Sequence, residues 1–232
     1  MPRKTNRSYI LHRGIGKVEK KATYEELNLK LLELLSDCWD RVISLDFETY
    51  VVENRFLNDE KILSVSFARR VSGKTMQAEG IEVKSNVLNK EDKDSEKQML
   101  DWLDEELGKI NPLGVVGYML RAYDIPLLIM KKERNKVEGS PYWKIIDLTE
   151  NAVHVDLYHL LRDRGYNNLY DAISSLSQNL PLKKVEDYLS QNREMKGKAV
   201  KELWEKGALK EYNEGHAYNM LLIAEWLTFG GE

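Results

Sequence analysis

Two carboxylates stand two residues apart in a segment that is otherwise largely apolar. Asp46 and Glu48 fall within residues 41–49, whose apolar side chains predict a buried strand. Alternate residues of a strand point to the same face, so the two carboxylates would lie side by side, where they repel each other. A divalent cation such as Mg²⁺ or Mn²⁺ removes that repulsion, and it prefers oxygen ligands of this kind. The pair therefore predicts a metal site at this strand.

A third acidic residue follows a second buried segment. Residues 113–118 predict a short strand, and Asp124 stands just before Pro126, at the start of a predicted apolar helix. Taken alone, Asp124 would be the N-cap of that helix. Taken with the first two acids, a carboxylate at a strand-to-helix junction is where a third acid of a metal site is expected.

The last candidates lie near the C-terminal end of the sequence. Tyr212 and His216 are four residues apart, in a segment that opens a predicted helix over residues 217–229, so they share a helix face. A neutral histidine is a metal ligand better suited to Mn²⁺, Fe²⁺ or Zn²⁺ than to Mg²⁺, and a protonated one is a cation that can lie beside phosphate. Glu214, two residues before His216, would point to nearly the opposite face of the helix.

In order and spacing, these segments resemble the motifs of the DEDD 3′–5′ exonucleases, in particular the proofreading domain of family B DNA polymerases and its stand-alone relatives. Leu45–Thr49 resembles the first motif, a hydrophobic residue followed by Asp-x-Glu-Thr. Gly117–Leu128 resembles the second, in which Gly-aromatic-Asn precedes Phe/Tyr-Asp-hydrophobic-Pro. Val155–Tyr158 resembles the strand that follows it, and Tyr212–His216 falls where the third motif, Tyr-x3-Asp, is expected.

The resemblance implies an RNase H-like α/β fold, with a mixed central sheet flanked by helices, and two-metal hydrolysis of phosphodiester bonds at the 3′ end of single-stranded DNA or RNA. It implies that Asp46 bridges two Mg²⁺ or Mn²⁺ ions, that Glu48 and Asp124 each hold one ion, and that Tyr212 orients the attacking water. His216 replaces the fourth acid, so it would complete the metal site of an impaired or Mn²⁺-preferring enzyme. The alternative is a catalytically inactive relative that binds nucleic acid or a replication or repair partner.

Several further residues are candidates for contacts with nucleic acid. Met119 stands where the second motif usually has Asn. Four aromatic residues either stack on bases or pack as ordinary half-buried side chains: Tyr142, Trp143, Tyr166 and Tyr170. Six basic residues either line a phosphate path or form solvated surface: Lys131, Lys132, Arg134, Lys136, Lys183 and Lys184.

Composition limits the class of protein. The chain has 232 residues, of which 42% are hydrophobic and 31% charged, as in a folded globular protein. Its net charge of −3 excludes a globally basic protein that coats nucleic acid, but allows binding through a local patch. The lone Cys38 excludes a disulfide framework and a cysteine-based zinc cluster. With no apolar segment of membrane-spanning length and no secretory signal, we expect a reducing, intracellular (cytoplasmic) location and no membrane contact.

The hydrophobic pattern predicts a basic N-terminal extension and leading helix over residues 1–40, followed by an exonuclease-like domain over residues 41–232. Residues 1–21 carry seven Lys and Arg against one Glu, as a solvated tail or an arm that contacts phosphates would. Helices are predicted over residues 24–39, 95–110, 124–134 and 217–229. Strands are predicted over residues 41–49, 61–69, 75–84, 113–118 and 153–157. Clustered strands followed by strands alternating with helices indicate an α/β or α+β sheet covered by helices.

Overall fold

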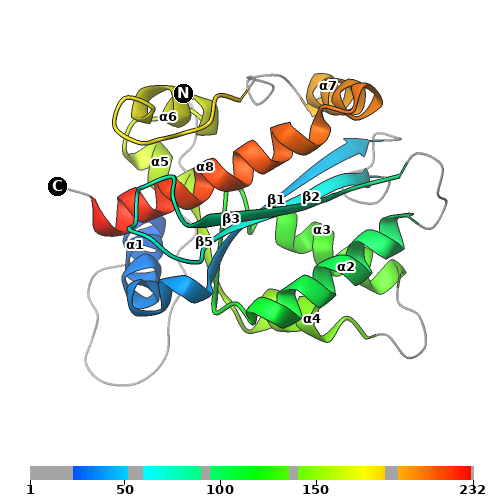
Figure 1. The fold of residues 1–232 in the computed structure, drawn as a ribbon, viewed down its shortest axis with the longest axis horizontal. Helices are drawn as coiled ribbons and strands as arrows, with labels where there is room; N and C mark the ends of the chain where they lie inside the picture. Colours follow the sequence, from blue (N-terminus) through cyan, green and yellow to red (C-terminus); the bar gives the residue numbers. More distant parts are fainter. Residues whose placement is uncertain (1–22, 52–59, 90–94, 136–140, 186–192, 231–232) are drawn as a thin grey trace.

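A five-stranded mixed sheet forms the centre of the molecule (Figure 1). The computed structural model describes residues 23–51, 60–89, 95–135, 141–185 and 193–230. The sheet has the order β3-β2-β1-β4-β5, and its strands are β1 (Val42–Val51), β2 (Glu60–Arg70), β3 (Ile81–Val87), β4 (Gly114–Gly117) and β5 (Val153–Asp156). The first three strands pair antiparallel, whereas β4 and β5 run parallel to β1. The α/β fold with a mixed central sheet is therefore confirmed.

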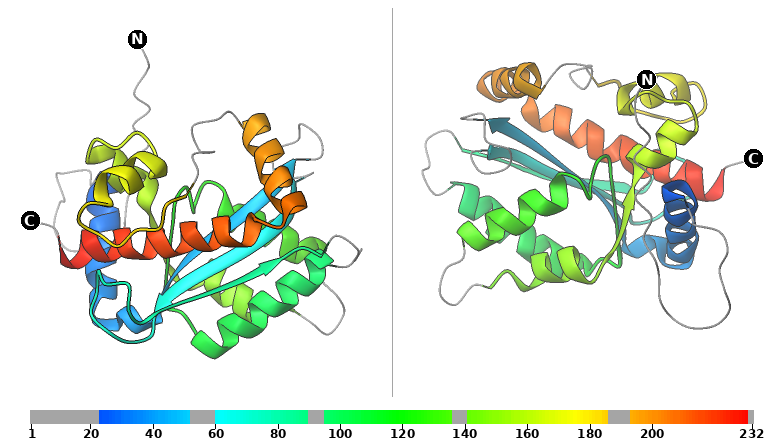
Figure 2. Two further views of the ribbon diagram at one scale, coloured as in Figure 1. Left: turned by 45° about the horizontal axis from the view of Figure 1, so that its top comes forward. Right: turned by 180° about the vertical axis from the view of Figure 1, so that it is seen from behind.

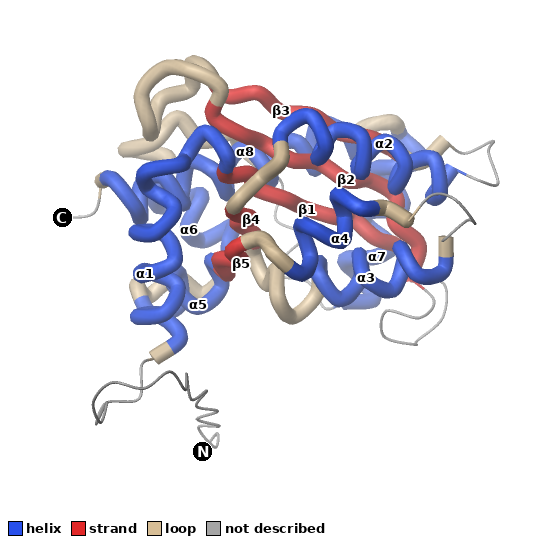
Figure 3. Tube along the Cα trace, turned by 90° about the horizontal axis from the view of Figure 1, so that it is seen from below, coloured by secondary structure: helices blue, strands red, loops and turns tan. Residues whose placement is uncertain are grey.

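Helices cover both faces of this sheet. They are α1 (Tyr24–Leu35), α2 (Ser95–Ile110), α3 (Asp124–Arg134), α4 (Trp143–Glu150), α5 (Leu157–Asp163), α6 (Leu169–Leu176), α7 (Arg193–Lys206) and α8 (Leu209–Phe229). Seen from below, α2, α3 and α4 lie in front of the sheet and α8 crosses behind it (Figure 3). In the other views, α7 lies beside the beginning of α8, near β1 (Figure 2).

The side chains of the central strand β1 alternate between an apolar and a polar face of the sheet. Its apolar residues Ile43, Leu45 and Phe47 join the core that α2, α3 and α4 cover. The residues that alternate with them, Ser44, Asp46 and Glu48, face α8. This alternation is the period of two expected of a strand, and it gathers the polar side chains under one helix.

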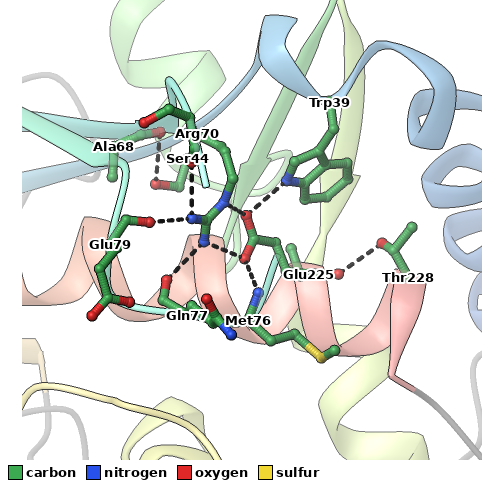
Figure 4. Close-up of polar contacts among 11 residues, drawn as sticks. Trp39, Ser44, Ala68, Arg70, Met76, Gln77, Glu79, Glu225 and Thr228 are labelled. Atoms are coloured by element: carbon green, nitrogen blue, oxygen red, sulfur yellow. Dashed lines mark hydrogen bonds and ion pairs between the residues drawn. The ribbon is translucent and has the colours of Figure 1, made fainter. Parts of the chain in front are cut away.

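The long helix α8 is buried over most of its length, although it carries polar residues throughout. It packs across β1, β2 and β3, and side-chain hydrogen bonds join it to all three strands. The hydroxyl of Ser44 donates to the carbonyl oxygen of Ala217 at 2.6 Å. Near the other end of the helix, Glu225 binds Arg70 of β2 (Figure 4). These bonds fix where each α8 residue lies over the sheet.

The boundaries of three elements differ from the sequence prediction by more than two residues. The leading helix α1 ends at Leu35 and continues as a 3-10 helix, η1 (Ser36–Arg41). The predicted strand over residues 75–84 begins at Ile81, because a loop closed by Gly73 and Gly80, with φ of 78° and 76°, precedes it. Helix α8 begins at Leu209, so the whole third motif is helical.

The basic segment of residues 1–21 lies outside the described residues. No helix in the described ranges is long and apolar enough to cross a membrane.

Candidate metal centre

The acidic pair lies immediately before an irregularity in the sheet. Asp46 and Glu48 are opposite Ser66 and Ser64 of β2, and the register shifts between Glu48 and Thr49. Such a bulge bends the strand and increases its twist, and bulges are frequent beside functional sites. The two carboxylates therefore share the α8 face at the point where regular pairing stops.

Helix α8 brings an imidazole to this pair. His216 Nδ1 lies 3.4 Å from Asp46 Oδ2 and 3.3 Å from Glu48 Oε1. Ligand atoms of these three residues all lie within 4.8 Å of one another. The Glu48 and His216 side chains are 1% and 2% exposed, whereas that of Asp46 is 15% exposed. Two carboxylate oxygens and an imidazole nitrogen at this separation fit the donor set of a divalent transition metal, and Asp46 is the member open to solvent.

The two carboxylates determine the charge of the imidazole. Burial of His216 lowers its pKa, but the close contacts with the Asp46 and Glu48 carboxylates and the charges of those carboxylates outweigh burial and raise the pKa to about 9. At neutral pH an imidazolium therefore lies between two carboxylates. His216 Nε2 is also buried, with no hydrogen-bond partner in the part of the chain that the structure describes.

Tyr212 and Asp124 lie around this cluster. The ring of Tyr212 packs on that of His216, with their centroids 4.3 Å apart, as the spacing of four residues predicted. Asp124 is the first residue of α3 and only 3% exposed. The interpretation of Asp124 as the N-cap is wrong, because Tyr123 occupies that position and no side chain caps the helix.

Asp124 does not belong to the group formed by Asp46, Glu48 and His216, but its charge acts on Tyr123, as do the charges of Asp46 and Glu48. Burial raises the pKa of Tyr123, and the charges of Asp124, Glu48 and Asp46 raise it further. The charges of the three carboxylates from the first two motifs therefore all act on one phenol. The structure thus brings all five predicted site residues to one region, and it places three of them within metal-ligand distance of one another.

A buried amide that sequence reasoning missed also reaches the cluster. Asn213 Nδ2 donates to Asp46 Oδ2 at 2.6 Å, and the Ser64 hydroxyl donates to Asn213 Oδ1 at 2.8 Å. Both Asn213 and Ser64 are fully buried. The available signal was the spacing, since Asn213 precedes His216 by three residues and so lies on the same side of the helix.

A second missed group links the first two motifs. The hydroxyls of Thr49 and Tyr123 are 2.5 Å apart, and Tyr123 also donates to the carboxylate of Glu60. Because the single phenol proton goes to that carboxylate, Thr49 is the donor in the other bond. Glu60 is 1% exposed. Glu60, the first residue of β2, therefore holds Tyr123 in place beside Asp124.

Glu214 does not replace the missing fourth acid. Its carboxylate accepts a hydrogen bond of 2.6 Å from Ser85 of β3, so it points away from His216, as the helical spacing predicted. Within the described residues, no other carboxylate completes the group formed by Asp46, Glu48 and His216.

The predicted stacking residues lie in different surroundings. Tyr142 is 1% exposed and donates to the Asn135 carbonyl oxygen, so it is a core residue and cannot stack on a base. Trp143 is 66% exposed, but it begins α4 on the face of the sheet opposite α8. Tyr166 and Tyr170 are half-buried, and their stacking role stays a prediction.

The basic residues are also divided. Lys131 is buried and pairs with Glu96 at 2.8 Å, so it forms neither a phosphate path nor solvated surface. Lys132 is 6% exposed. Lys183 lies over the ring of Tyr218 at 4.7 Å. Lys136 lies outside the described residues.

Comparisons with known proteins point to one family. A family model matches residues 55–227, and its description is a predicted 3′–5′ exonuclease related to the exonuclease domain of PolB. The match begins after Asp46 and Glu48 and includes Asp124, Tyr212 and His216. No curated protein matches the sequence.

A solved structure has a similar fold. It is the family B DNA polymerase from the hyperthermophilic archaeon Pyrobaculum calidifontis, with a TM-score of 0.52 and 15% sequence identity. The similarity covers 80% of this chain and 24% of the polymerase chain, and at this identity it shows a shared fold alone. Since the family model matches well over half of the sequence, the chain belongs to the family of predicted 3′–5′ exonucleases related to the exonuclease domain of PolB.

Proposed function

We propose that this protein is a metal-dependent 3′–5′ exonuclease that hydrolyses phosphodiester bonds of single-stranded DNA or RNA. One observation carries the proposal: the carboxylates of Asp46 and Glu48 and the imidazole of His216 offer ligand atoms within 4.8 Å of one another. Membership of the exonuclease family supports the same conclusion. A fully buried carboxylate such as that of Glu48 is costly to desolvate, so the cluster has little structural value of its own.

The proposal assigns a role to each side chain. Asp46, Glu48 and His216 would hold one divalent ion, and Asp124 would share a second with Asp46. Bound Mg²⁺ or Mn²⁺ would lower the pKa of water and offset the charge of the phosphodiester. Tyr212, which packs on His216, would orient the attacking water by a hydrogen bond from its hydroxyl.

A second function has a specific observation in its favour. His216 Nδ1 lies 3.4 Å from Asp46 Oδ2 and 3.3 Å from Glu48 Oε1, and the two carboxylates raise the pKa of His216, so an imidazolium would balance much of the carboxylate charge without any metal. A protein with such an internally neutralised cluster could bind the 3′ end of a nucleic acid, or a replication or repair partner, without cleaving a bond.

A cleavage assay separates the two functions. We would incubate 5′-labelled single-stranded DNA and RNA oligonucleotides with the protein in Mg²⁺, Mn²⁺ or EDTA, beside Asp46→Ala. The exonuclease proposal predicts a metal-dependent ladder that shortens from the 3′ end, stronger with Mn²⁺ than with Mg²⁺, and lost in the variant. Comparing the DNA and RNA ladders identifies the substrate class.

Glu214→Gln is the matched control. This acid belongs to the same helical segment as His216, but it faces β3 and should leave the ladder unchanged. No cleavage with either metal, together with a gel shift that Asp46→Ala retains, would reject the exonuclease in favour of a binding protein.

A further inference from the structure

We infer that Asn213 is a positioning residue, which with Ser64 fixes the carboxylate of Asp46 for metal binding. The inference rests on the proposed metal site, but it concerns residues of β2 and α8 that none of the three motifs identifies. Ser64, Asn213 and Asp46 form a chain of two hydrogen bonds, of 2.8 and 2.6 Å, that crosses from β2 through α8 to β1.

The chemistry of the three groups determines the direction of both bonds. An ionised carboxylate only accepts hydrogen bonds, so the amide nitrogen of Asn213 must face Asp46. The amide oxygen then faces Ser64, whose hydroxyl must donate. Since Ser64 and Asn213 are both 0% exposed, water cannot replace either partner. The hydroxyl of Ser64 therefore keeps the amide of Asn213 from rotating.

An amide suits this position better than a charged group. A cationic side chain at position 213 would repel the metal ion that Asp46, Glu48 and His216 would hold. The amide of Asn213 donates to the carboxylate without adding charge, and it holds the oxygen while the rest of the carboxylate stays available. Groups that orient metal ligands in this way commonly change metal affinity by about 10–100-fold when they are removed.

The sheet offers a matched control two residues along β2. Ser66 is also 0% exposed, and its hydroxyl also donates to Asn213 at 2.8 Å, but to the backbone carbonyl oxygen. Ser64→Ala and Ser66→Ala thus each remove one buried hydroxyl of β2, and in both cases the lost hydrogen bond is one to Asn213. Only Ser64→Ala releases the side-chain amide.

The test measures Mn²⁺ affinity and stability of the full chain in parallel. Mn²⁺ binding is followed by electron paramagnetic resonance of the free ion, and unfolding by urea. We expect Ser64→Ala and Asn213→Ala to weaken Mn²⁺ binding about tenfold or more, and Ser66→Ala to change it less than about threefold. Both serine variants should lose similar stability. Equal weakening of Mn²⁺ binding by the two serine variants would show a merely structural role and overturn the inference.

A measurement without metal keeps the inference separate from the proposed function. If the wild-type protein binds no Mn²⁺, the proposed metal site fails, and the hydrogen-bond chain is judged by NMR alone. The side-chain amide protons of Asn213 should exchange slowly in the wild type and in Ser66→Ala, and about tenfold faster in Ser64→Ala. Unchanged exchange in Ser64→Ala would show that Ser64 does not hold the amide.

Discussion

The guanidinium of Arg70 and the carboxylate of Glu225 face each other through two hydrogen bonds, of 2.6 and 2.7 Å, that join β2 to α8 (Figure 4). The Glu225 side chain is fully buried and also accepts from the Trp39 indole at 3.0 Å and the Met76 backbone N–H at 2.6 Å. The other donors of Arg70 bind carbonyl oxygens of the loop before β3. A buried ion pair with so many hydrogen bonds anchors the C-terminal end of α8, the end that is farther along the helix from His216.

Breaking this pair from one side should destabilise the whole protein. Glu225→Gln removes the negative charge and leaves the Arg70 guanidinium buried without a counter-ion. We expect a loss of about 3–5 kcal/mol in the free energy of unfolding, measured by urea denaturation.

A neighbouring ion pair is the matched control. Arg69 binds Glu82 at 2.6 Å, but the two side chains are 26% and 31% exposed. Glu82→Gln should cost at most about 1 kcal/mol, because solvent screens the pair. Equal losses of unfolding free energy in the two variants would mean that burial does not determine how much the Arg70–Glu225 pair stabilises the fold.

Periodicity predicted an α/β or α+β sheet covered by helices, and the resemblance to the DEDD exonucleases implied the mixed central sheet. The alternation around Asp46 and Glu48 placed both acids on one face, and the spacing of Tyr212 and His216 placed them on one side of a helix. These are local rules, in which the residues concerned belong to one element each.

The contacts between elements could not be predicted in the same way. Ser64 and Asn213 are ordinary polar residues in the sequence. Their hydrogen bond forms only because the fold brings together two residues that are 149 positions apart. The same holds for Glu60 and Tyr123, which are 63 positions apart. Lys131 looked like solvated surface because its partner, Glu96, comes from a different helix.

Met119 has a backbone conformation that its residue type disfavours. Its φ is 59°, in the left-handed region, where asparagine is more readily accommodated than methionine. Its side chain is 42% exposed, so little packing is lost when it is replaced. We expect Met119→Asn to raise the free energy of unfolding by about 0.5–1 kcal/mol, measured by urea denaturation.

Met119→Gln separates backbone conformation from polarity. Glutamine is as polar as asparagine but has no preference for the left-handed region, so this variant should match the wild type. A similar gain from both substitutions would show that the stabilisation comes from removing an exposed apolar side chain.

His154 gives the fold a dependence on pH away from the metal cluster. Burial lowers its pKa, and the charge of Arg121 lowers it further, although the hydrogen bond between Nε2 and the Leu148 carbonyl oxygen, 2.7 Å long, acts in the opposite direction. A histidine whose folded pKa lies below its unfolded value of about 6.5 stabilises the fold above that pH. Its contribution is lost as the pH falls, because the unfolded chain takes up the proton more readily.

The corresponding measurement compares the wild type with His154→Gln at about pH 7.5 and about pH 5.5. Glutamine retains a donor for the Leu148 carbonyl oxygen but does not titrate. We expect the stability of the wild type relative to this variant to decrease at the lower pH. A difference that stays constant between the two pH values would contradict a lowered pKa of His154 in the folded protein.

Replacing His216 by aspartate tests whether this position belongs to a metal site. The change adds a third carboxylate beside Asp46 and Glu48, whose ligand atoms already lie within 4.8 Å of those of His216. Without metal, the repulsion of three adjacent carboxylates should lower the Tm. With Mg²⁺, which prefers oxygen ligands, the same variant should gain more stability than the wild type does.

The expected size of that gain follows from binding equilibria. Mg²⁺ at about 100 times its Kd stabilises the native state by about 2.7 kcal/mol, and each kcal/mol raises the Tm of a chain of this size by about 2–4 °C. His216→Asn is the control, because it has the shape of aspartate without the charge, and it should show no such response to Mg²⁺. If His216→Asp lowered the Tm as predicted but gained nothing from Mg²⁺, and Mg²⁺-supported cleavage stayed unchanged, residue 216 would lie outside the metal site and the third motif would have to be placed elsewhere.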